Sequence, residues 1–343
     1  MTAAPVRVLI ASALESEHVR RIAAVDPRIE VLHAPELLPA PHYAADHHGT
    51  PRNLTRDQRE QWRSMLAAAQ VSFDFDWSDA AQMPANCPEL RWVQGTSSGI
   101  GEFLQRTGLG RSEVTFTTAA GIHAVPLAEF ALTGLLYFVK DVPALTRWQA
   151  ARRWERYTTR QLAGMRVLVI GLGHVGRKVA DVLSAAGVEV WGVGRDGRAD
   201  RGSLACATGI SSLDDVLPSV NGVVLCCPQT PETEGLLSGP RIRLLPKGAI
   251  VVNISRGQVI DEPALIAALA DGHLGGACLD VATVEPLPED SPLWAMPSVL
   301  ISPHSASTVA SENAAITDLF CDNLRRWLGG EQLLNVYSRD KGY

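Results

Sequence analysis

The sequence predicts an α/β fold in which parallel sheets are covered by helices on both faces. The chain has 343 residues, and at roughly 100 to 200 residues per domain this length indicates two domains or one large α/β domain. Short apolar runs alternate with stretches whose apolar residues recur at three- and four-residue steps, which is the pattern of βαβ units. These runs fall into two series along the chain.

Composition and charge exclude several classes of protein. Hydrophobic residues make up 46% of the chain and charged residues 20%, which excludes wholesale disorder and collagen-like or coiled-coil architecture. The net charge of −6 and the lack of a long Lys/Arg run argue against a nucleic-acid partner. No apolar stretch approaches the roughly 18 residues of a membrane span, and Val6–Ala11 is too short for a signal-peptide core. We therefore expect no membrane partner. The six cysteines form no CxxC pair, so we expect them to be reduced core residues of a cytoplasmic protein.

The first series contains five expected strands. They are Val6–Ala11, Ile29–Leu32, Val71–Phe75, Arg91–Gly95 and Val114–Thr117. A His/Pro-rich piece from Pro41 to Pro51 interrupts the series, and we expect an irregular surface segment there. Within it, His47 and His48 lack a second ligand pair at metal-binding spacing, so we interpret them as a solvated loop and predict no metal site.

An amphipathic helix from Pro126 to Val139 is expected to join the two series. The second series has expected strands at Arg166–Ile170, Val188–Val193, Gly222–Cys226, Ala249–Asn253, Ala277–Val281 and Val299–Ser302. A last helix is predicted over Ala310–Leu328, and Gly329-Gly330 supplies its stop signal.

A glycine-rich turn in the second series matches the pattern G-x-G-x-x-G. Gly171, Gly173 and Gly176 follow an apolar strand and open a helix with an apolar face. Gly171 allows the tight turn, Gly173 lets the backbone approach a pyrophosphate, and Gly176 permits close packing of the helix on the strand. The N–H groups and dipole at the helix start, where His174 and Val175 lie, attract the anion. This context favours a dinucleotide-binding loop over a turn with no ligand. A second match, Gly192, Gly194 and Gly197, precedes a polar stretch without a helical apolar stripe, and we interpret it as a coincidence.

The residues after the next strand bear on the choice of dinucleotide. An NAD site usually has Asp or Glu roughly 20 residues beyond the loop, where it bonds the ribose 2′-OH. Here Gly194 stands at that place and Arg195 follows it. A guanidinium pairs well with a 2′-phosphate, so the sequence favours NADP(H). The alternative is NAD, with Arg195 solvated and Asp196 bonding the ribose.

Four more segments carry ordered motifs. They are Pro228–Thr233, Lys247–Gly257, Leu279–Pro288 and Ser302–His304. With the glycine loop, their order and spacing resemble the D-isomer-specific 2-hydroxyacid dehydrogenases, and the glyoxylate/hydroxypyruvate reductases among them. With Trp92–Gly101 and Asn323–Tyr343 the resemblance covers nearly the whole chain.

The resemblance implies two Rossmann-like or flavodoxin-like domains with parallel sheets. A dinucleotide-binding domain, 119–308, is inserted into a discontinuous substrate domain, 1–118 and 309–343. The chemistry is expected in the cleft between them. The resemblance also implies a homodimer formed through the cofactor domain.

Three polar residues each follow a predicted strand, at one rim of a parallel sheet, where ligands of open α/β sheets bind: Arg256, Glu285 and His304. Reducing a 2-oxo acid needs a cation for the carboxylate and ketone, a hydride donor, and an acid for the developing alkoxide. Arg256 suits the first role because its planar fork matches a carboxylate. His304 suits the last because it titrates near neutral pH, and Glu285 can orient its imidazole. The family assigns the same roles to the matching residues. Taken singly, each also fits a structural role; together they favour catalysis.

The resemblance assigns the remaining site residues. The family's Asp matching Asp280 lies at the nicotinamide carboxamide, although an Asp closing a strand is also a routine structural residue. Pro228 is expected to contact the cofactor. The segment Gln94–Gly101 resembles the family's substrate loop, whose N–H groups receive the substrate carboxylate, and Ser98 and Gly99 are the candidates, against the alternative of an ordinary Gly/Ser turn.

The expected function is hydride transfer between NAD(P)H and the C2 carbonyl of a small 2-oxo acid such as glyoxylate or hydroxypyruvate. Glu285 argues against the family's formate-oxidising branch, which has Gln before its His. One alternative is a non-catalytic dinucleotide sensor resembling the family's corepressors. Another is phosphonate oxidation, which similar residues support.

Overall fold

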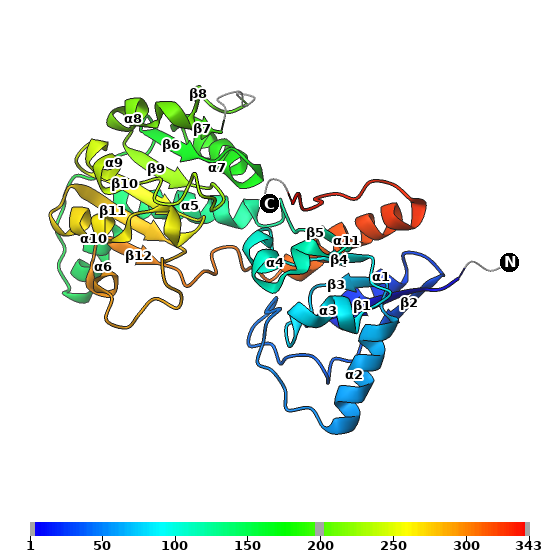
Figure 1. The fold of residues 1–343 in the computed structure, drawn as a ribbon. Helices are drawn as coiled ribbons and strands as arrows, with labels where there is room; N and C mark the ends of the chain where they lie inside the picture. Colours follow the sequence, from blue (N-terminus) through cyan, green and yellow to red (C-terminus); the bar gives the residue numbers. More distant parts are fainter. Residues whose placement is uncertain (1–3, 196–201, 340–343) are drawn as a thin grey trace. The chain divides into compact units, whose positions relative to one another are not determined.

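The computed structural model describes residues 4–195 and 202–339. The chain divides into two compact units: Met1–His123 with Thr308–Tyr343, and Ala124–Ser307. The sequence predicts the corresponding boundaries after residues 118 and 308. Each unit contains one sheet of parallel strands with helices on both faces (Figure 1). The predicted α/β class is therefore confirmed.

The sheet of the first unit has the strand order β2-β1-β3-β4-β5. Its strands are β1 Val6–Ile10, β2 Ile29–Leu32, β3 Val71–Phe73, β4 Trp92–Gln94 and β5 Thr115–Thr117. Numbered within the unit, this order is 2-1-3-4-5, the flavodoxin-like arrangement of doubly wound folds. Its helices are α1 Ser16–Ala23, α2 Arg56–Ala68, α3 Met83–Asn86, α4 Gly101–Thr107 and α11 Glu312–Gly329.

Side chains that alternate along a strand fill two separate cores in this unit. Leu9 of β1 packs with buried residues of α2, α3 and α4. Its neighbours Val8 and Ile10 pack instead with α1 and α11. The second core explains why the chain returns to this unit at its C-terminal end, because Phe320 of α11 stacks on Trp92 with ring centroids 5.1 Å apart.

The sheet of the second unit has the order β12-β11-β10-β9-β6-β7-β8. Its strands are β6 Arg166–Ile170, β7 Glu189–Gly194, β8 Cys206–Gly209, β9 Gly222–Leu225, β10 Ala249–Asn253, β11 Leu274–Leu279 and β12 Val299–Ile301. Numbered within the unit, the order begins 3-2-1-4-5-6 from the β8 edge, which is the Rossmann order, and β6 and β9 flank its switch point. Ligands of such sheets bind at the carboxyl ends of the strands near that point.

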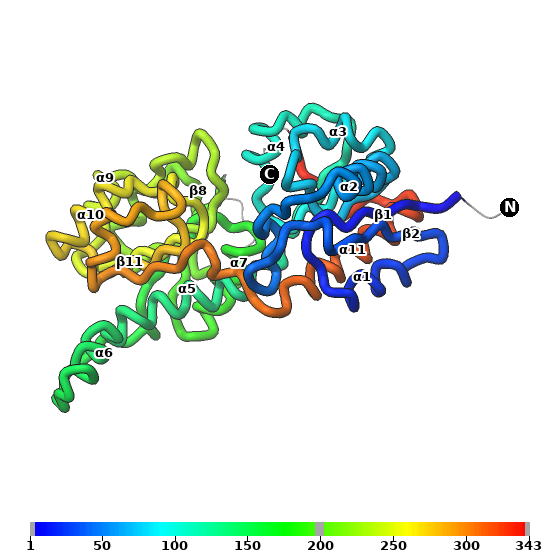
Figure 2. The backbone as a smooth tube through the Cα atoms, turned by 90° about the horizontal axis from the view of Figure 1, so that it is seen from below, coloured from blue at the N-terminus to red at the C-terminus, as the bar shows by residue number. Residues whose placement is uncertain are grey.

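The helices of the second unit are α5 Ala124–Val139, α6 Val142–Ala150, α7 His174–Ala185, α8 Leu213–Val216, α9 Gly239–Leu244 and α10 Glu262–Ala270. One face of the sheet packs on α5 and α7, and the other on α8, α9 and α10. Figure 2 shows α6 projecting beyond the sheet of its unit. Single turns of 3-10 helix complete the chain at Ala80–Gln82, Leu109–Arg111, Ile210–Ser212, Leu217–Ser219, Gly257–Val259 and Pro292–Ala295.

One strand was not predicted, and one prediction about local structure is wrong. The sequence gives no sign of β8, because Cys206-Ala-Thr-Gly209 has no apolar run; it is an edge strand that pairs only with β7 among the described strands. His47 is not solvated but 7% exposed, and its Nδ1 lies 3.2 Å from the Ser12 hydroxyl. His48 is exposed and packs on the Trp77 ring.

The six cysteines carry free thiols; four are buried, and Cys206 and Cys226 are partly exposed. Across residues 4–195 and 202–339, no helix is both long enough and apolar enough to cross a membrane.

Candidate active site

The glycine loop links β6 to α7 and presents the start of a 12-residue helix. Gly171 has a φ of +97°, and a side chain there would begin 2.5 Å from the backbone nitrogen of Cys227. Only glycine therefore fits this turn. At Gly173 a side chain would meet no atom within 4 Å, so the backbone here borders open space. His174 and Val175 open the helix, and their N–H groups stand in its first turn, where no intrahelical acceptor exists. These residues fit a bound pyrophosphate.

Arg195 directly follows β7 and is exposed. The hydroxyl of Thr230 is the main cause that lowers the pKa of Glu232, and the positive charge of Arg195 contributes, which places these side chains in one neighbourhood. Gly192 and Gly194 of the second glycine match lie within β7 itself and not in a turn, whereas Gly197 and Asp196 fall outside the described residues.

Pro228 lies beyond the carboxyl end of β9 and is exposed. Its carbonyl oxygen accepts a hydrogen bond of 2.6 Å from the Thr233 hydroxyl. This bond closes the turn that follows the switch-point strand.

Arg256 follows β10, at the same sheet edge as the glycine loop, and is partly buried. The turn that carries it is built around Asn253, which is 1% exposed. Asn253 Nδ2 donates to the Arg256 carbonyl at 2.9 Å, while its Oδ1 accepts from the N–H and hydroxyl of Ser255. The Arg256 guanidinium itself donates to the Ser255 carbonyl at 2.7 Å. Asn253 thus orients the arginine, a role that the sequence analysis missed although a polar residue ends an otherwise apolar strand.

The turn after β10 is joined to the turn after β11 by close backbone packing. A side chain at Gly257 would begin 2.0 Å from the carbonyl group of Ala282. The Gln258 side chain also donates to the Thr283 carbonyl at 3.0 Å. The segment that carries Arg256 is therefore fixed against the segment that leads to Glu285.

Glu285 and His304 meet although 19 positions separate them. Nδ1 of His304 lies 2.7 Å from Oε2 of Glu285, and Oε1 of Glu285 accepts the Ala282 N–H at 3.1 Å. The His304 side chain is 46% exposed and the Glu285 side chain is 38% exposed, so the imidazole is reachable from solvent. His304 has a φ of +53°, in the left-handed region that non-glycine residues rarely adopt.

Asp280, 2% exposed, holds the His304 segment in that conformation. Its Oδ1 accepts the Ser302 hydroxyl at 2.7 Å and the Ala306 N–H at 2.9 Å, and its carbonyl accepts the His304 N–H at 2.8 Å. The carboxylate thus spans both sides of the histidine. The structure adds this anchoring role to the cofactor contact that the sequence predicts.

The charges of the three residues act on one another. The hydrogen bond to Glu285 raises the pKa of His304 and outweighs the opposing effect of burial. Burial acts to raise the pKa of Glu285, but the hydrogen bonds from His304 and the Ala282 N–H hold it below its ordinary value. The positive charge of Arg256 lowers both pKa values, which places the guanidinium near the pair. The arrangement brings together an imidazole whose protonated form is stabilised, the carboxylate that stabilises it, and a cation whose charge acts on both.

Ser98 and Gly99 lie in the first unit, in the loop after β4. The Ser98 hydroxyl contacts the Ala119 carbonyl at 3.1 Å and His123 Nδ1 at 3.0 Å. The Gly99 N–H lies 3.3 Å from the Ser97 hydroxyl. The side chains of Ser97 and Ser98 thus hold the loop.

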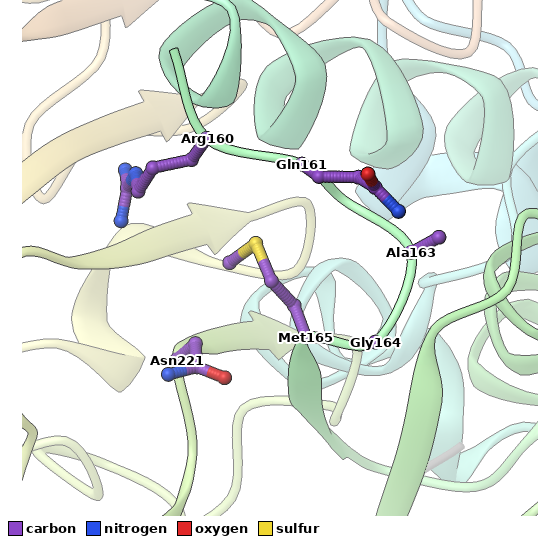
Figure 3. A pocket seen from close by; sticks show the side chains of 6 residues that line it. All are labelled: Arg160, Gln161, Ala163, Gly164, Met165 and Asn221. Atoms are coloured by element: carbon purple, nitrogen blue, oxygen red, sulfur yellow. The ribbon is translucent and has the colours of Figure 1, made fainter. Parts of the chain in front are cut away.

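A hollow lined by Arg160, Gln161, Ala163, Gly164, Met165 and Asn221 lies at the other edge of the second sheet, where β6 begins (Figure 3). Arg160 donates to the Gly248 carbonyl at 3.0 Å. The hollow contains none of the predicted site residues and lies at the amino ends of the strands. Within the described part of the chain, no group of three or more His, Cys, Asp or Glu side chains is placed to hold a metal ion.

Comparison with known proteins identifies relatives of the whole arrangement. Residues 132–306 match the family model described as the D-isomer specific 2-hydroxyacid dehydrogenase, NAD binding domain. The chain is 35% identical over 264 residues to a D-3-phosphoglycerate dehydrogenase of Mycobacterium tuberculosis (strain ATCC 25618 / H37Rv), covering 73% of this chain but only 47% of that protein. The chain therefore spans about half the length of that relative.

Two further relatives match more of their own length. Identity with glyoxylate/hydroxypyruvate reductase A of Klebsiella pneumoniae (strain 342) is 31% over 242 residues, which is 70% of this chain and 72% of that protein. A crystal structure of a D-isomer specific 2-hydroxyacid dehydrogenase from Xanthobacter autotrophicus Py2, in complex with NADPH and MES, superposes with a TM-score of 0.79 at 32% identity, covering 99% of this chain and 100% of that one.

Proposed function

The chain belongs to the D-isomer-specific 2-hydroxyacid dehydrogenases, NAD(P)-dependent oxidoreductases that act on CH–OH groups, and from that premise we propose that it reduces a small 2-oxo acid such as glyoxylate or hydroxypyruvate. The observation that carries the proposal is the 2.7 Å contact of His304 with Glu285, on which the charge of Arg256 also acts. A proton donor and a carboxylate-binding cation are the two groups that the protein itself must supply to reduce a 2-oxo acid, because the hydride comes from the cofactor.

We assign the substrate carboxylate to Arg256, and we propose that the Ser98–Gly99 loop of the first unit is a substrate-binding loop. The guanidinium offers a planar fork of donors that matches a carboxylate, and its charge also polarises the adjacent ketone. Asn253 fixes the backbone from which Arg256 extends. The ligand is therefore held by its acid group, which every 2-oxo acid shares.

With its pyrophosphate held at the glycine loop, the reduced dinucleotide would supply a hydride for C2 of the substrate. His304 gives the proton from its ring to the C2 oxygen as negative charge develops there. Glu285 stabilises the imidazolium before transfer and still accepts the Nδ1–H hydrogen bond afterwards, so the proton that leaves the ring is the one on Nε2. The products are the 2-hydroxy acid and the oxidised cofactor. Asp280 keeps the histidine segment in place throughout.

The test is a panel of 2-oxo acids assayed by the absorbance of reduced nicotinamide, with NADPH and with NADH. We expect turnover of glyoxylate or hydroxypyruvate, and a fall of about 10² or more in kcat/KM for His304→Ala and Arg256→Ala with NADPH affinity retained. His273→Asn is the matched control, because His273 lies in the same unit and contacts the Ile242 carbonyl, away from the site. Full activity of either site variant contradicts the mechanism; tight NADPH binding without turnover on any acid indicates a non-catalytic sensor.

We propose a preference for NADP(H) over NAD(H). Its support is Arg195 after β7, the absence of an acid at Gly194, and the NADPH complex of the Xanthobacter autotrophicus relative. Arg195→Ala is expected to raise KM for NADPH about tenfold or more and to leave KM for NADH within about twofold, because only NADPH carries the 2′-phosphate. Equal KM values for the two cofactors in the unmodified protein contradict the preference.

We also propose a homodimer formed through the second unit. Its support is α6 with the exposed residues 151–161 that follow it, and above all Trp154, which is 98% exposed. Trp148 is held edge-on to Tyr157 at 4.6 Å, so the projecting segment is braced rather than loose. A large aromatic side chain is strongly enriched at interfaces. Sedimentation velocity should give a dimer that Trp154→Ser weakens; a monomer at micromolar concentration contradicts the proposal.

A further inference from the structure

A buried hydrogen-bonded chain runs behind the Ser98 loop in the first unit. Nδ1 of His123 lies 3.0 Å from Oγ of Ser98, and Nε2 of the same ring lies 3.1 Å from Oε1 of Glu312. His123 is 9% exposed and Glu312 is 8% exposed. The chain connects the loop after β4 with the first residue of α11, 189 positions from His123.

The proton count fixes the direction of these bonds. The Ser98 hydroxyl also lies 3.1 Å from the Ala119 carbonyl oxygen, which can only accept. Because a hydroxyl has one proton, that proton goes to Ala119, and His123 Nδ1 must donate to Ser98. The contact of Nε2 with Glu312 then holds a second proton, shared between ring and carboxyl. With Nδ1–H pointing at Ser98, this contact ties the second nitrogen of the ring to α11.

The packing of the first unit does not by itself explain why His123 and Glu312 are buried together. Replacing a buried ionisable pair with apolar residues is often neutral or stabilising, so the pair is costly unless its hydrogen bonds have a use. Oε2 of Glu312 is buried without a hydrogen-bond partner among the described residues, which adds to the cost. The bonds of the ring are directed at one target, the Ser98 hydroxyl.

We propose that His123, whose ring is tied to α11 through Glu312, is a positioning residue for the 2-oxo acid, acting through Ser98. The inference rests on the proposed function. With its own proton committed to Ala119, the Ser98 hydroxyl has none to offer a ligand, so the substrate carboxylate meets the peptide N–H groups of the loop. The hydrogen bonds that join this hydroxyl to His123 and Ala119 set the direction of those N–H groups. The effect belongs to substrate binding, since the proton donor His304 is on the other unit.

Two substitutions of His123 separate the two bonds of the ring. Asparagine places an amide N–H where Nδ1 stands and loses the contact to Glu312, whereas glutamine reaches the Nε2 position and loses the contact to Ser98. We expect His123→Gln and Ser98→Ala each to raise KM for glyoxylate about tenfold with kcat changed less than about threefold. His123→Asn should instead keep KM for glyoxylate within about threefold of the value for the unmodified protein.

A double variant and a control complete the test. Ser98→Ala with His123→Gln should be no worse than the poorer single variant, because both remove the same bond. His18→Gln is the matched control, since His18 is 7% exposed, lies on α1 of the same unit and contacts Arg21 rather than the loop. Its KM should stay unchanged. Additive effects, equal KM values for His123→Asn and His123→Gln, or an unchanged KM in His123→Gln overturn the proposal.

A readout independent of turnover separates this inference from the proposed function. In protein labelled with ¹⁵N at histidine, the Nδ1–H proton of His123 should give a slowly exchanging imidazole resonance that is missing in His123→Asn. Ser98→Ala should shift it or abolish it. If no 2-oxo acid is reduced, the proposed function fails while this resonance still shows whether the chain exists. A resonance that Ser98→Ala leaves unaltered overturns the chain itself.

Discussion

The carbonyl oxygen of Gly171 lies 1.8 Å from the point at which a side chain on residue 176 would begin. Helix α7 therefore approaches the glycine loop so closely that only a residue without Cβ fits. We expect Gly176→Ala to lower the free energy of unfolding by about 2 kcal/mol or more, because overpacking a tight contact displaces backbone. Thermal unfolding measures it.

Gly173 provides the matched comparison within the same loop. A side chain there meets nothing within 4 Å, so Gly173→Ala should leave the unfolding temperature within about 2 °C. NADPH affinity should nevertheless fall about tenfold, because the methyl group enters the space that a pyrophosphate needs. An unchanged Kd for NADPH in this variant would mean that the dinucleotide does not approach the loop at Gly173.

The pair of His304 and Glu285 predicts the pH dependence of reduction. Reduction needs the protonated imidazole, so kcat/KM falls as pH rises through the pKa of His304. Glu285 raises that pKa, which extends activity to higher pH. Glu285→Gln removes the negative charge and should move the basic limb of the kcat/KM profile down by about one pH unit. Glu289→Gln, at an exposed carboxylate four positions along the chain, should leave the limb in place. If the limb also stays in place in Glu285→Gln, then Glu285 does not set the pKa that the profile reports.

The role of Asp280 can be assigned by comparing the effects of its substitution on kcat and on the Kd for NADPH. If its carboxylate anchors the His304 segment, Asp280→Ala lowers kcat about tenfold or more, while the Kd for NADPH changes less than about threefold. Asp280→Asn keeps an acceptor oxygen and should recover part of kcat. A loss confined to NADPH affinity would instead assign the residue to the cofactor, as the family resemblance implies.

The buried hydrogen bonds of Asn323, on α11, predict an effect on the stability of the first unit. It is fully buried; its Nδ2 donates to Gln94 Oε1 at 3.1 Å and to the Leu334 carbonyl at 3.2 Å, and its Oδ1 accepts the Leu334 N–H at 2.7 Å. Asn323→Ala leaves these buried groups unpaired and should cost about 2–4 kcal/mol in urea denaturation. Asp322→Ala, exposed on the same helix, should cost less than about 0.5 kcal/mol. Similar losses for both would show that Asn323 makes no special contribution.

Local patterns in the sequence account for much of this molecule. The apolar run of β6 and the glycines after it predict the turn at Gly171 and the start of α7, because strand periodicity and the glycine requirement both act over a few residues. Parallel strands also bring their carboxyl ends to one edge, so the order of motifs already places Arg256, Glu285 and His304 at a common rim. That logic fails at β8, whose pairing with β7 rather than its own composition makes it a strand.

The sequence by itself predicted the α/β class and the dinucleotide loop from local spacing, and the candidate catalytic residues from the ends of predicted strands together with the family resemblance. Only the tertiary structure decided which polar side chains are buried and which atoms they meet. His47 looks solvated in the sequence yet lies in the core, and His123 finds Glu312 across 189 positions. Such contacts depend on how the first unit closes around α11, and no local periodicity encodes the distance between residues so far apart in the chain.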